Sequence, residues 1–421
     1  MDKKLEFPKG FFWGAATSAH QVEGNNHNDW TQWEKVNAER LSKESGGKYP
    51  RENYISGRAC DHYNRYEEDF DLAKEMGHNA HRFSIEWSRI EPEEGKFNEQ
   101  EIEHYQTVID ELKKRGLEAF VTVWHNSSPI WIRNIGGWEN SRTVYYFSRY
   151  VDKISRSLRG VNFWMSLNEP GIYVGLGYIQ GQQPPGVKSF KRAYKVFKNF
   201  INAHRNAYRI IHEIHPETKV GIAHYMVWNR PYKNLPWNNL IVWVLNYLRN
   251  TWLLNSIKNS NDFIGLNYYH TDFLNFKFGK GKWWFIELFN PNKWINDLGW
   301  QIYPEGIYHM LKRASIYKKP IYITENGVAD SKDVHRERFI KEHLWWVHKA
   351  IEERMDVRGY FHWSLLDNFE MNRLDGFWPR FGLIEIDYET LERKPRPSSM
   401  IYAEIAKSNS IKEITKGGEE E

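Results

Sequence analysis

Eight short apolar runs, each followed by a stretch with helical periodicity, limit what this chain can fold into. An apolar run of four to eight residues is typical of a strand buried on both faces, and strands that alternate with helices form parallel sheets. The runs are FFWGAATSA from Phe11, HRFSIEW from His81, EAFVTVWH from Glu118, NFWMSLNEP from Asn162, KVGIAHY from Lys219, DFIGLNYY from Asp262, PIYITENG from Pro320 and GYFHWSLLDN from Gly359.

The stretches between these runs include DHYNRYEEDFDLAKEMG from Asp61, EQEIEHYQTVIDELKKRG from Glu99 and HRERFIKEHLWWVHKAIEER from His335. Gly77 and Gly116 end the first two, as glycines at helix C-termini do. Eight strand–helix units in 421 residues predict an α/β protein, a closed (β/α)8 TIM barrel rather than an open doubly wound sheet. No linker or repeat divides the chain. We therefore expect a single domain over residues 1–421, with the acidic tail 416–421 disordered.

The composition excludes several classes of protein. The 58 basic and 54 acidic residues are interspersed and give a net charge of only +4, which argues against a nucleic-acid partner. The single cysteine, Cys60, predicts no disulfide and no metal site, and no motif indicates a cofactor. The N-terminus lacks the apolar core of a signal peptide, so a cytoplasmic protein is expected. Abundant Lys and Glu favour a thermostable protein, although plentiful Asn argues the other way.

Polar side chains gather where the predicted strands end, which is where barrels of this type carry their chemistry. Two of them, Glu169 and Glu325, would face each other across one mouth, and such a pair of carboxylates is what glycoside hydrolysis requires. Either one alone could instead pair with a cation or cap a helix. The residues at these strand ends are Arg82, His125, Asn168, Glu169, Asn267, Tyr269, Glu325 and Trp363.

Six strings give the chain a specific resemblance. FFWGAATSAHQVEG, RFSIEWSRI, SLNEP, GLNYY, ITENG and WSLLDNFE stand in the order typical of glycoside hydrolase family 1, the β-glucosidase and β-glycosidase family, between Phe11 and about Tyr388. The resemblance implies a retaining, exo-acting β-glycosidase that hydrolyses terminal β-D-glucosides, and also galactosides or mannosides. Glu169 would be its acid/base and Glu325 its nucleophile. Arg82 would keep Glu325 ionised, and the charge of Glu325 would keep Glu169 protonated.

The resemblance also implies a set of sugar-binding residues. Trp363 would form a stacking floor, Asn168 would bond the 2-hydroxyl, Asn267 would support the site, and Tyr269 would hydrogen-bond the nucleophile. Two positions depart from the family: Met371 replaces a tryptophan and Asn126 replaces an aromatic residue. They leave open the choice among glucose, galactose, mannose and fucose. The residues expected to bind the sugar are Gln21, His125, Asn168, Trp363 and Glu370, although His125 and Trp363 could also be core residues.

The segment LIVWVLNYLRNTWLL, Leu240 to Leu254, is apolar on every side of a helical wheel, so it should be buried. It is too short to span a bilayer. The first interpretation is a barrel-packing helix or a subunit contact. The alternative is an interfacial element that, together with KWWFIELF at 282–289, docks peripherally on membrane lipid or detergent or binds apolar aglycones. The alternative predicts a preference for alkyl or aryl glycosides.

Two rival functions remain at this level. A 6-phospho-β-glycosidase would need a cationic phosphate site after the last strands, and Arg373 is the candidate for it. A non-catalytic sugar-binding barrel would normally have lost one of the two glutamates, and both are present.

Overall fold

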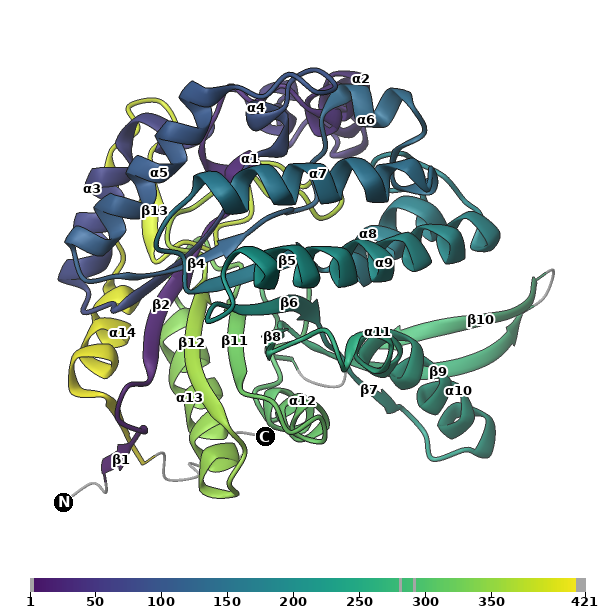
Figure 1. Cartoon of the computed structure of the whole chain (residues 1–421). Helices are drawn as coiled ribbons and strands as arrows, with labels where there is room; N and C mark the ends of the chain where they lie inside the picture. Colours follow the sequence, from purple (N-terminus) through teal and green to yellow (C-terminus); the bar gives the residue numbers. More distant parts are fainter. Residues whose placement is uncertain (1–3, 280–281, 291–292, 414–421) are drawn as a thin grey trace.

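The computed structural model of the chain describes residues 4–279, 282–290 and 293–413, so the predicted tail 416–421 lies outside the described residues. Within these ranges, parallel strands close into a barrel in which β12 pairs with β2, and the (β/α)8 prediction is confirmed (Figure 1). The barrel strands are β2 (Phe12–Ala16), β3 (Ala80–Ser84), β4 (Glu118–Thr122), β5 (Phe163–Asn168), β6 (Lys219–Tyr225), β8 (Phe263–Asn267), β11 (Ile321–Asn326) and β12 (Val357–Trp363).

Helices surround the barrel on its outer side (Figure 1). The three helices predicted from periodicity are confirmed to within two residues at each end. Gly77 and Gly116 have φ values of +80° and +69°, and Leu117 N–H bonds the Leu112 carbonyl across the second of these ends. The glycines therefore close both helices as predicted. The outer helices are α3 (His62–Glu75), α5 (Glu99–Lys114), α7 (Arg142–Ser157), α9 (Phe190–Ile214), α12 (Glu305–Ser315), α13 (Arg336–Glu352) and α14 (Pro397–Ser408).

Aromatic rings fill the lower interior of the barrel. Phe120 and Phe163 stack with ring centroids 4.2 Å apart, and Tyr322 and Phe361 pack against Phe120. These rings form one buried cluster with Trp363. The interior of the barrel is therefore a packed core, and polar residues that could carry chemistry are placed at the carboxyl ends of the strands.

The connections that follow the barrel strands carry further helices and strands. These are α1 (Ala19–Val22), α2 (Asp29–Glu44), η1 (Arg51–Tyr54), α4 (Trp87–Ile90), α6 (Ile130–Asn134), η2 (Gly137–Glu139), α8 (Pro170–Val174), η3 (Gly175–Gln180), β13 (Ile384–Ile386) and β14 (Arg393–Pro395). At the opposite end, β1 (Lys4–Glu6) pairs with β15 (Ser410–Lys412) and brings the two ends of the described chain together.

A lobe extends from the barrel between β6 and α12 (Figure 1). Its three-stranded sheet has the order β10-β9-β7. Its helices include the predicted apolar segment, Leu240–Leu254. No helix among the described residues is long and apolar enough to cross a membrane. The elements are β7 (Trp228–Pro231), α10 (Pro236–Asn246), η4 (Tyr247–Thr251), α11 (Trp252–Ile257), β9 (Thr271–Gly279) and β10 (Lys282–Phe289).

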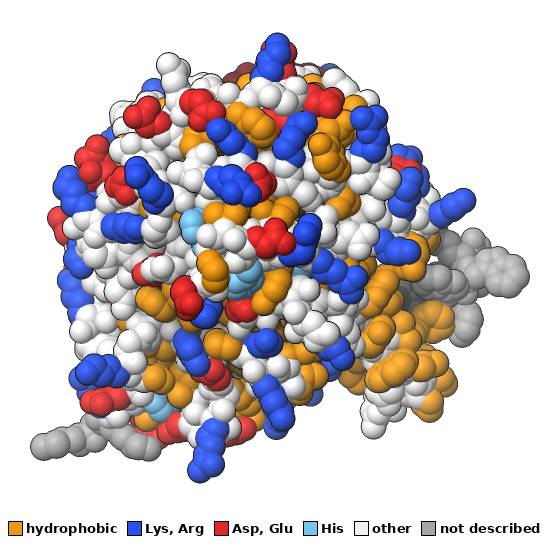
Figure 2. All heavy atoms as spheres, viewed as in Figure 1, with side chains coloured by type: hydrophobic (Ala, Val, Ile, Leu, Met, Phe, Trp, Pro, Cys, Tyr) orange, Lys and Arg blue, Asp and Glu red, His pale blue; other side chains and the backbone are white. Residues whose placement is uncertain are grey.

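The expected burial of Leu240–Leu254 is wrong for its first half. Leu253 and Leu254 are buried, but Leu240 and Trp243 are 61% and 68% exposed. The reason is that this segment turns a polar face inward, where Asn238, Asn246 and Asn250 form hydrogen bonds with β9, with β7 and with the residue directly before β7. We call the outward residues the apolar patch: Trp237, Leu240, Trp243, Val244, Tyr247 and Leu248. Figure 2 shows hydrophobic side chains gathered over this lobe.

Candidate active site

The two predicted carboxylates lie at the mouth of the barrel on different strands. Glu325 is in β11, in register with Asn267 of β8, and Glu169 directly follows β5. Glu169 has φ +45°, a left-handed conformation that is uncommon outside glycine, and its N–H bonds the Ala223 carbonyl at 2.9 Å. Both side chains are buried. The structure therefore brings the two glutamates into one enclosed site.

Glu325 is held by a cation and a hydroxyl. Arg82 Nη1 bonds Glu325 Oε1 at 2.5 Å, and Tyr269 donates its hydroxyl to Oε2 at 2.6 Å. Arg82 is fully buried. Charge-assisted hydrogen bonds of this kind stabilise a carboxylate and fix its orientation.

Arg82 is itself fixed by the surrounding strand ends. Its Nε donates to Thr122 Oγ1 at 3.2 Å, and its guanidinium also donates to the Thr324 carbonyl at 3.0 Å and to Asn168 Oδ1 at 2.7 Å. Sequence reasoning missed both threonines. The available signal was a hydroxyl residue near the end of an otherwise apolar strand.

Glu169 has a different environment. Asn267 Nδ2 donates to Glu169 Oε1 at 2.6 Å, and Thr324 Oγ1 donates to Asn267 Oδ1 at 2.6 Å, which fixes the orientation of the amide. Burial, and then the negative charge of Glu325, raise the pKa of Glu169 to about 8. At neutral pH the site therefore holds a protonated Glu169 beside a Glu325 that is bonded to a cation.

His125 offers a free donor to the site. Asn168 Oδ1 accepts from Arg82, so Asn168 Nδ2 donates to His125 Nε2, at 3.1 Å. The proton of the imidazole must then lie on Nδ1, a buried atom that has no hydrogen-bond partner among the described residues. Burial, and then the charge of Arg82, hold the pKa of His125 far below its usual value, so the ring is neutral. The ring of His125 stacks 5.9 Å from that of Trp363.

Gln21, Trp363 and Glu370 come from the ends of the adjacent strands β2 and β12 and from the segments that follow them. Gln21 Nε2 donates to Asn368 Oδ1 at 2.9 Å and to the Phe369 carbonyl at 2.8 Å, so Gln21 is tied to the segment after β12. Trp363 Nε1 lies 3.4 Å from Glu370 Oε1. Burial, and then the charge of Asp375, raise the pKa of Glu370 well above its usual value. A neutral Glu370 can both donate and accept hydrogen bonds.

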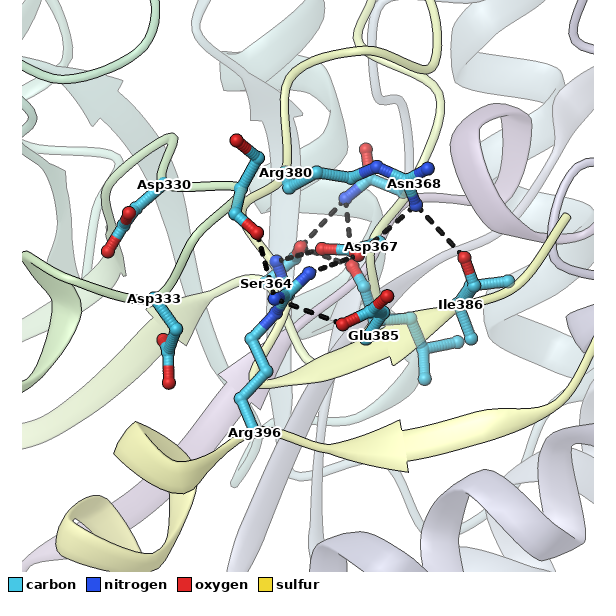
Figure 3. A network of polar contacts seen from close by, with 12 residues as sticks. Asp330, Asp333, Ser364, Asp367, Asn368, Arg380, Glu385, Ile386 and Arg396 are labelled. Carbon is cyan, nitrogen blue, oxygen red and sulfur yellow. Dashed lines mark hydrogen bonds and ion pairs between the residues drawn. The ribbon is translucent and has the colours of Figure 1, made fainter.

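A buried ion-pair network anchors the segment after β12. Arg396 and Arg380 both point toward Asp367 (Figure 3). Arg396 Nη2 bonds Asp367 Oδ2 at 2.7 Å, and Gly382 N–H donates to Asp367 Oδ1 at 2.9 Å. The network lies directly before Asn368 and Glu370 and positions them. Its residues were absent from the sequence prediction because ion pairs between distant segments leave no local pattern.

The two positions that depart from the family have simple structural roles. Met371 is buried in a hydrophobic cluster with Trp30, Phe369 and Leu374. Asn126 has φ +64°, and its carbonyl accepts from Trp30 Nε1 at 2.8 Å. Both positions therefore support the hydrophobic wall around Trp30, and the Met371 side chain has no hydrogen-bond donor for a ligand.

The glycine of the ITENG string is required by a close backbone approach. A Cβ atom at Gly327 would lie 1.8 Å from the Trp363 carbonyl oxygen. The ends of β11 and β12 can therefore bring Glu325 and Trp363 together only with glycine at this position. Among the described residues, no three His, Cys, Asp or Glu side chains are grouped to hold a metal ion.

Comparison with known proteins identifies the family. The model of glycosyl hydrolase family 1 matches residues 3–242 and 250–411. β-Glucosidase A of Acetivibrio thermocellus is 32% identical over 97% of this chain and 100% of its own length. A 6-phospho-β-galactosidase of Staphylococcus epidermidis is 30% identical over 98% of this chain and 100% of its own length. The structure of a β-glycosidase from Pyrococcus horikoshii has a TM-score of 0.89 and 38% identity, over 98% of this chain and 97% of that one. The chain belongs to glycosyl hydrolase family 1 and is a β-glycosidase.

Proposed function

We propose that the protein is a retaining, exo-acting β-glycosidase that hydrolyses terminal β-D-glucosides, with Glu325 as nucleophile and Glu169 as acid/base. The observation that carries this proposal is the asymmetry of the pair. Glu325 accepts hydrogen bonds from Arg82 and Tyr269, whereas Glu169 accepts one from an amide and has a pKa raised to about 8. Two carboxyl groups kept in different protonation states are what double displacement requires.

In the first step, Glu169 gives its proton to the glycosidic oxygen while the bond from that oxygen to the anomeric carbon breaks and Glu325 bonds the carbon. The covalent bond removes the negative charge of Glu325 and with it one cause of the raised pKa of Glu169. Glu169 is then better suited to take a proton from water, which attacks the anomeric carbon and releases Glu325. His125 Nδ1–H and the 2-hydroxyl partner Asn168 would hold the sugar above Trp363.

Glu169→Ala and Glu325→Ala test the roles with nitrophenyl β-D-glycosides and with substrates that have poor leaving groups. Glu169→Ala is expected to lose about 10²- to 10⁴-fold in kcat with poor leaving groups and much less with nitrophenol, because a good leaving group needs little acid help. Glu325→Ala is expected to lose turnover with every leaving group. Leaving-group sensitivity in the Glu325 variant instead would reverse the assignment.

The sugar is proposed to carry no phosphate, against the alternative of a 6-phospho-β-glycosidase. Burial, and then the charge of Asp375, raise the pKa of Glu370, so a phosphate bound next to Glu370 would meet the negative charge of Asp375. Arg373, the predicted phosphate ligand, is exposed. Hydrolysis of 4-nitrophenyl 6-phospho-β-D-galactoside in preference to the unphosphorylated glucoside and galactoside would contradict this.

The preferred aglycone is proposed to be an alkyl or aryl group, and the apolar patch is proposed to dock on a lipid surface. Trp and Tyr side chains favour the boundary between water and lipid, and the patch presents two Trp and one Tyr. Leu288 of the second predicted segment, 282–289, is also exposed in this lobe.

Sedimentation with phosphatidylcholine vesicles tests the lipid proposal. Trp243→Glu is expected to reduce the bound fraction severalfold, because a charge at a 68% exposed side chain opposes insertion without disturbing the fold. Phe190→Glu, at a 75% exposed residue of α9, is the matched control and should bind as the wild type does. Equal binding of all three proteins would refute the lipid proposal. A kcat/KM for cellobiose above that for octyl β-D-glucoside would refute the proposed preference for an apolar aglycone.

A further inference from the structure

A series of hydrogen-bonded polar side chains leads from the lobe to the strand end beside Asn267, the residue that bonds Glu169. Tyr225 is the last residue of β6 and lies in register with Asn267, the residue that bonds Glu169. Its ring stacks on that of Tyr269 with centroids 6.0 Å apart and an interplanar angle of 24°. Tyr225 is half-buried, so part of its side chain remains accessible.

Two residues that follow β8 hold the hydroxyl of Tyr225. The Tyr225 hydroxyl lies 3.0 Å from His270 Nδ1, and His270 Nε2 lies 3.2 Å from Asp272 Oδ1. Asp272 Oδ2 accepts from Arg249 Nη1 at 2.6 Å. Although burial favours the neutral acid, the charge of Arg249 holds the pKa of Asp272 below its usual value, so Asp272 is a carboxylate.

The donor and acceptor roles in this series of hydrogen bonds follow from the carboxylate of Asp272. A carboxylate only accepts, so His270 must carry a proton on Nε2, and an imidazole with its single proton on Nε2 presents a lone pair at Nδ1. Tyr225 must donate its only proton to that lone pair. The remaining lone pair of the Tyr225 oxygen is therefore left for a donor on the ligand.

We propose that Tyr225, oriented by His270 and Asp272, is a specificity-determining residue that accepts a hydrogen bond from a hydroxyl group on the aglycone. The leaving oxygen must lie beside Glu169, so the aglycone extends from it along the wall that Tyr225 and Tyr269 form. The aromatic ring of Tyr225 contacts the body of the aglycone, and its oxygen selects a hydroxyl. The inference rests on the proposed role of Glu169 as acid/base.

The test compares two glycosides that differ by one hydroxyl, phenyl β-D-glucoside and 2-(hydroxymethyl)phenyl β-D-glucoside. The measured quantity is the ratio of kcat/KM for the hydroxylated substrate to that for the phenyl substrate. Tyr225→Phe keeps the ring and removes the acceptor, so the ratio is expected to fall about five- to tenfold, the effect of one hydrogen bond. An equal loss on both substrates would show a structural role only, and no loss would show no contact; either result overturns the proposal.

Asp272→Asn tests the orienting part of the chain. The amide oxygen would accept from Arg249 and the amide N–H would donate to His270 Nε2, which moves the imidazole proton to Nδ1 and makes Tyr225 an acceptor of that proton. The expected results are a lower kcat/KM ratio and a change of the His270 tautomer from Nε2–H to Nδ1–H, read from nitrogen-15 chemical shifts. An unchanged tautomer together with an unchanged ratio would overturn the orientation argument.

Failure of this inference about Tyr225 can be distinguished from failure of the proposed role of Glu169. If Glu169 is not the acid/base, the leaving-group dependence of Glu169→Ala fails while the Tyr225 ratio is still measurable. If only the present inference fails, Glu169→Ala behaves as expected and the Tyr225→Phe ratio stays at the wild-type value.

Discussion

Replacing Glu169 by glutamine should stabilise the protein relative to the wild type, and this difference should grow as the pH rises. The carboxyl of Glu169 has a pKa of 4.5 when unperturbed and about 8 in the folded protein, because burial and the charge of Glu325 oppose its ionisation. Below pH 4.5 the group is protonated in both states and has no effect. Between these values the unfolded chain releases the proton first, so ionisation favours unfolding, and above pH 8 the full penalty is present.

The size of the effect follows from the two pKa values. One pKa unit corresponds to about 1.4 kcal/mol, so the penalty reaches at most about 5 kcal/mol, and relaxation of the site reduces it. Glutamine cannot ionise. The free energy of unfolding of Glu169→Gln, minus that of the wild type, should therefore increase by a few kcal/mol between pH 5 and pH 9.

Guanidinium unfolding followed by tryptophan fluorescence at pH 5, 7 and 9 measures this difference. Glu103→Gln, at an exposed position of α5, is the matched control, and its difference from the wild type should not change with pH. A difference for Glu169→Gln that stays constant or shrinks as the pH rises would mean that Glu169 is ionised in the folded protein, and the acid/base assignment would lose its physical basis.

Three further results are expected. kcat/KM for an alkyl β-glycoside, whose poor leaving group needs acid help, should fall above about pH 8 as Glu169 loses its proton, and a profile that stays flat to pH 10 would contradict this. Tyr269→Phe removes a donor to the Glu325 carboxylate and should lower kcat about 10- to 100-fold with little change in Tm; an unchanged kcat would exclude that contribution. Gly327→Ala forces a methyl group against the Trp363 carbonyl and should cost about 1–3 kcal/mol of unfolding free energy, and a variant as stable as the wild type would contradict the close approach.

The barrel was predictable because each barrel strand is an apolar run that is buried on both faces. The helices between them were predictable where a glycine marks the end, as Gly77 and Gly116 do. The lobe was not, because its strands β7 and β9 interrupt the alternation of strand and helix, and β9 follows the barrel strand β8 with no helix between them.

The position of chemical groups was predictable from strand ends, but their partners were not. Arg82 and Glu325 are distant in sequence and meet because β3 and β11 end at the same rim. Thr324 and Asp272 act by orienting another side chain, which no local pattern reveals. Burial of the first half of Leu240–Leu254 was predicted wrongly because a helix that is apolar on every side was expected to be buried, whereas its few asparagines form the face that meets the protein.

The closing of the barrel by β12 and β2 has a consequence for synthesis of the chain. Gly359 pairs with Phe12 and Trp363 pairs with Ala16, so the first barrel strand has one open edge until nearly the whole chain has left the ribosome. At about 5–20 residues per second, this delay is roughly 20 to 70 s. During that time β2 can pair only with β3, and an apolar strand edge is exposed to other nascent chains. Chaperone dependence of the yield should therefore arise from the N-terminal half of the chain, before the last strand is made.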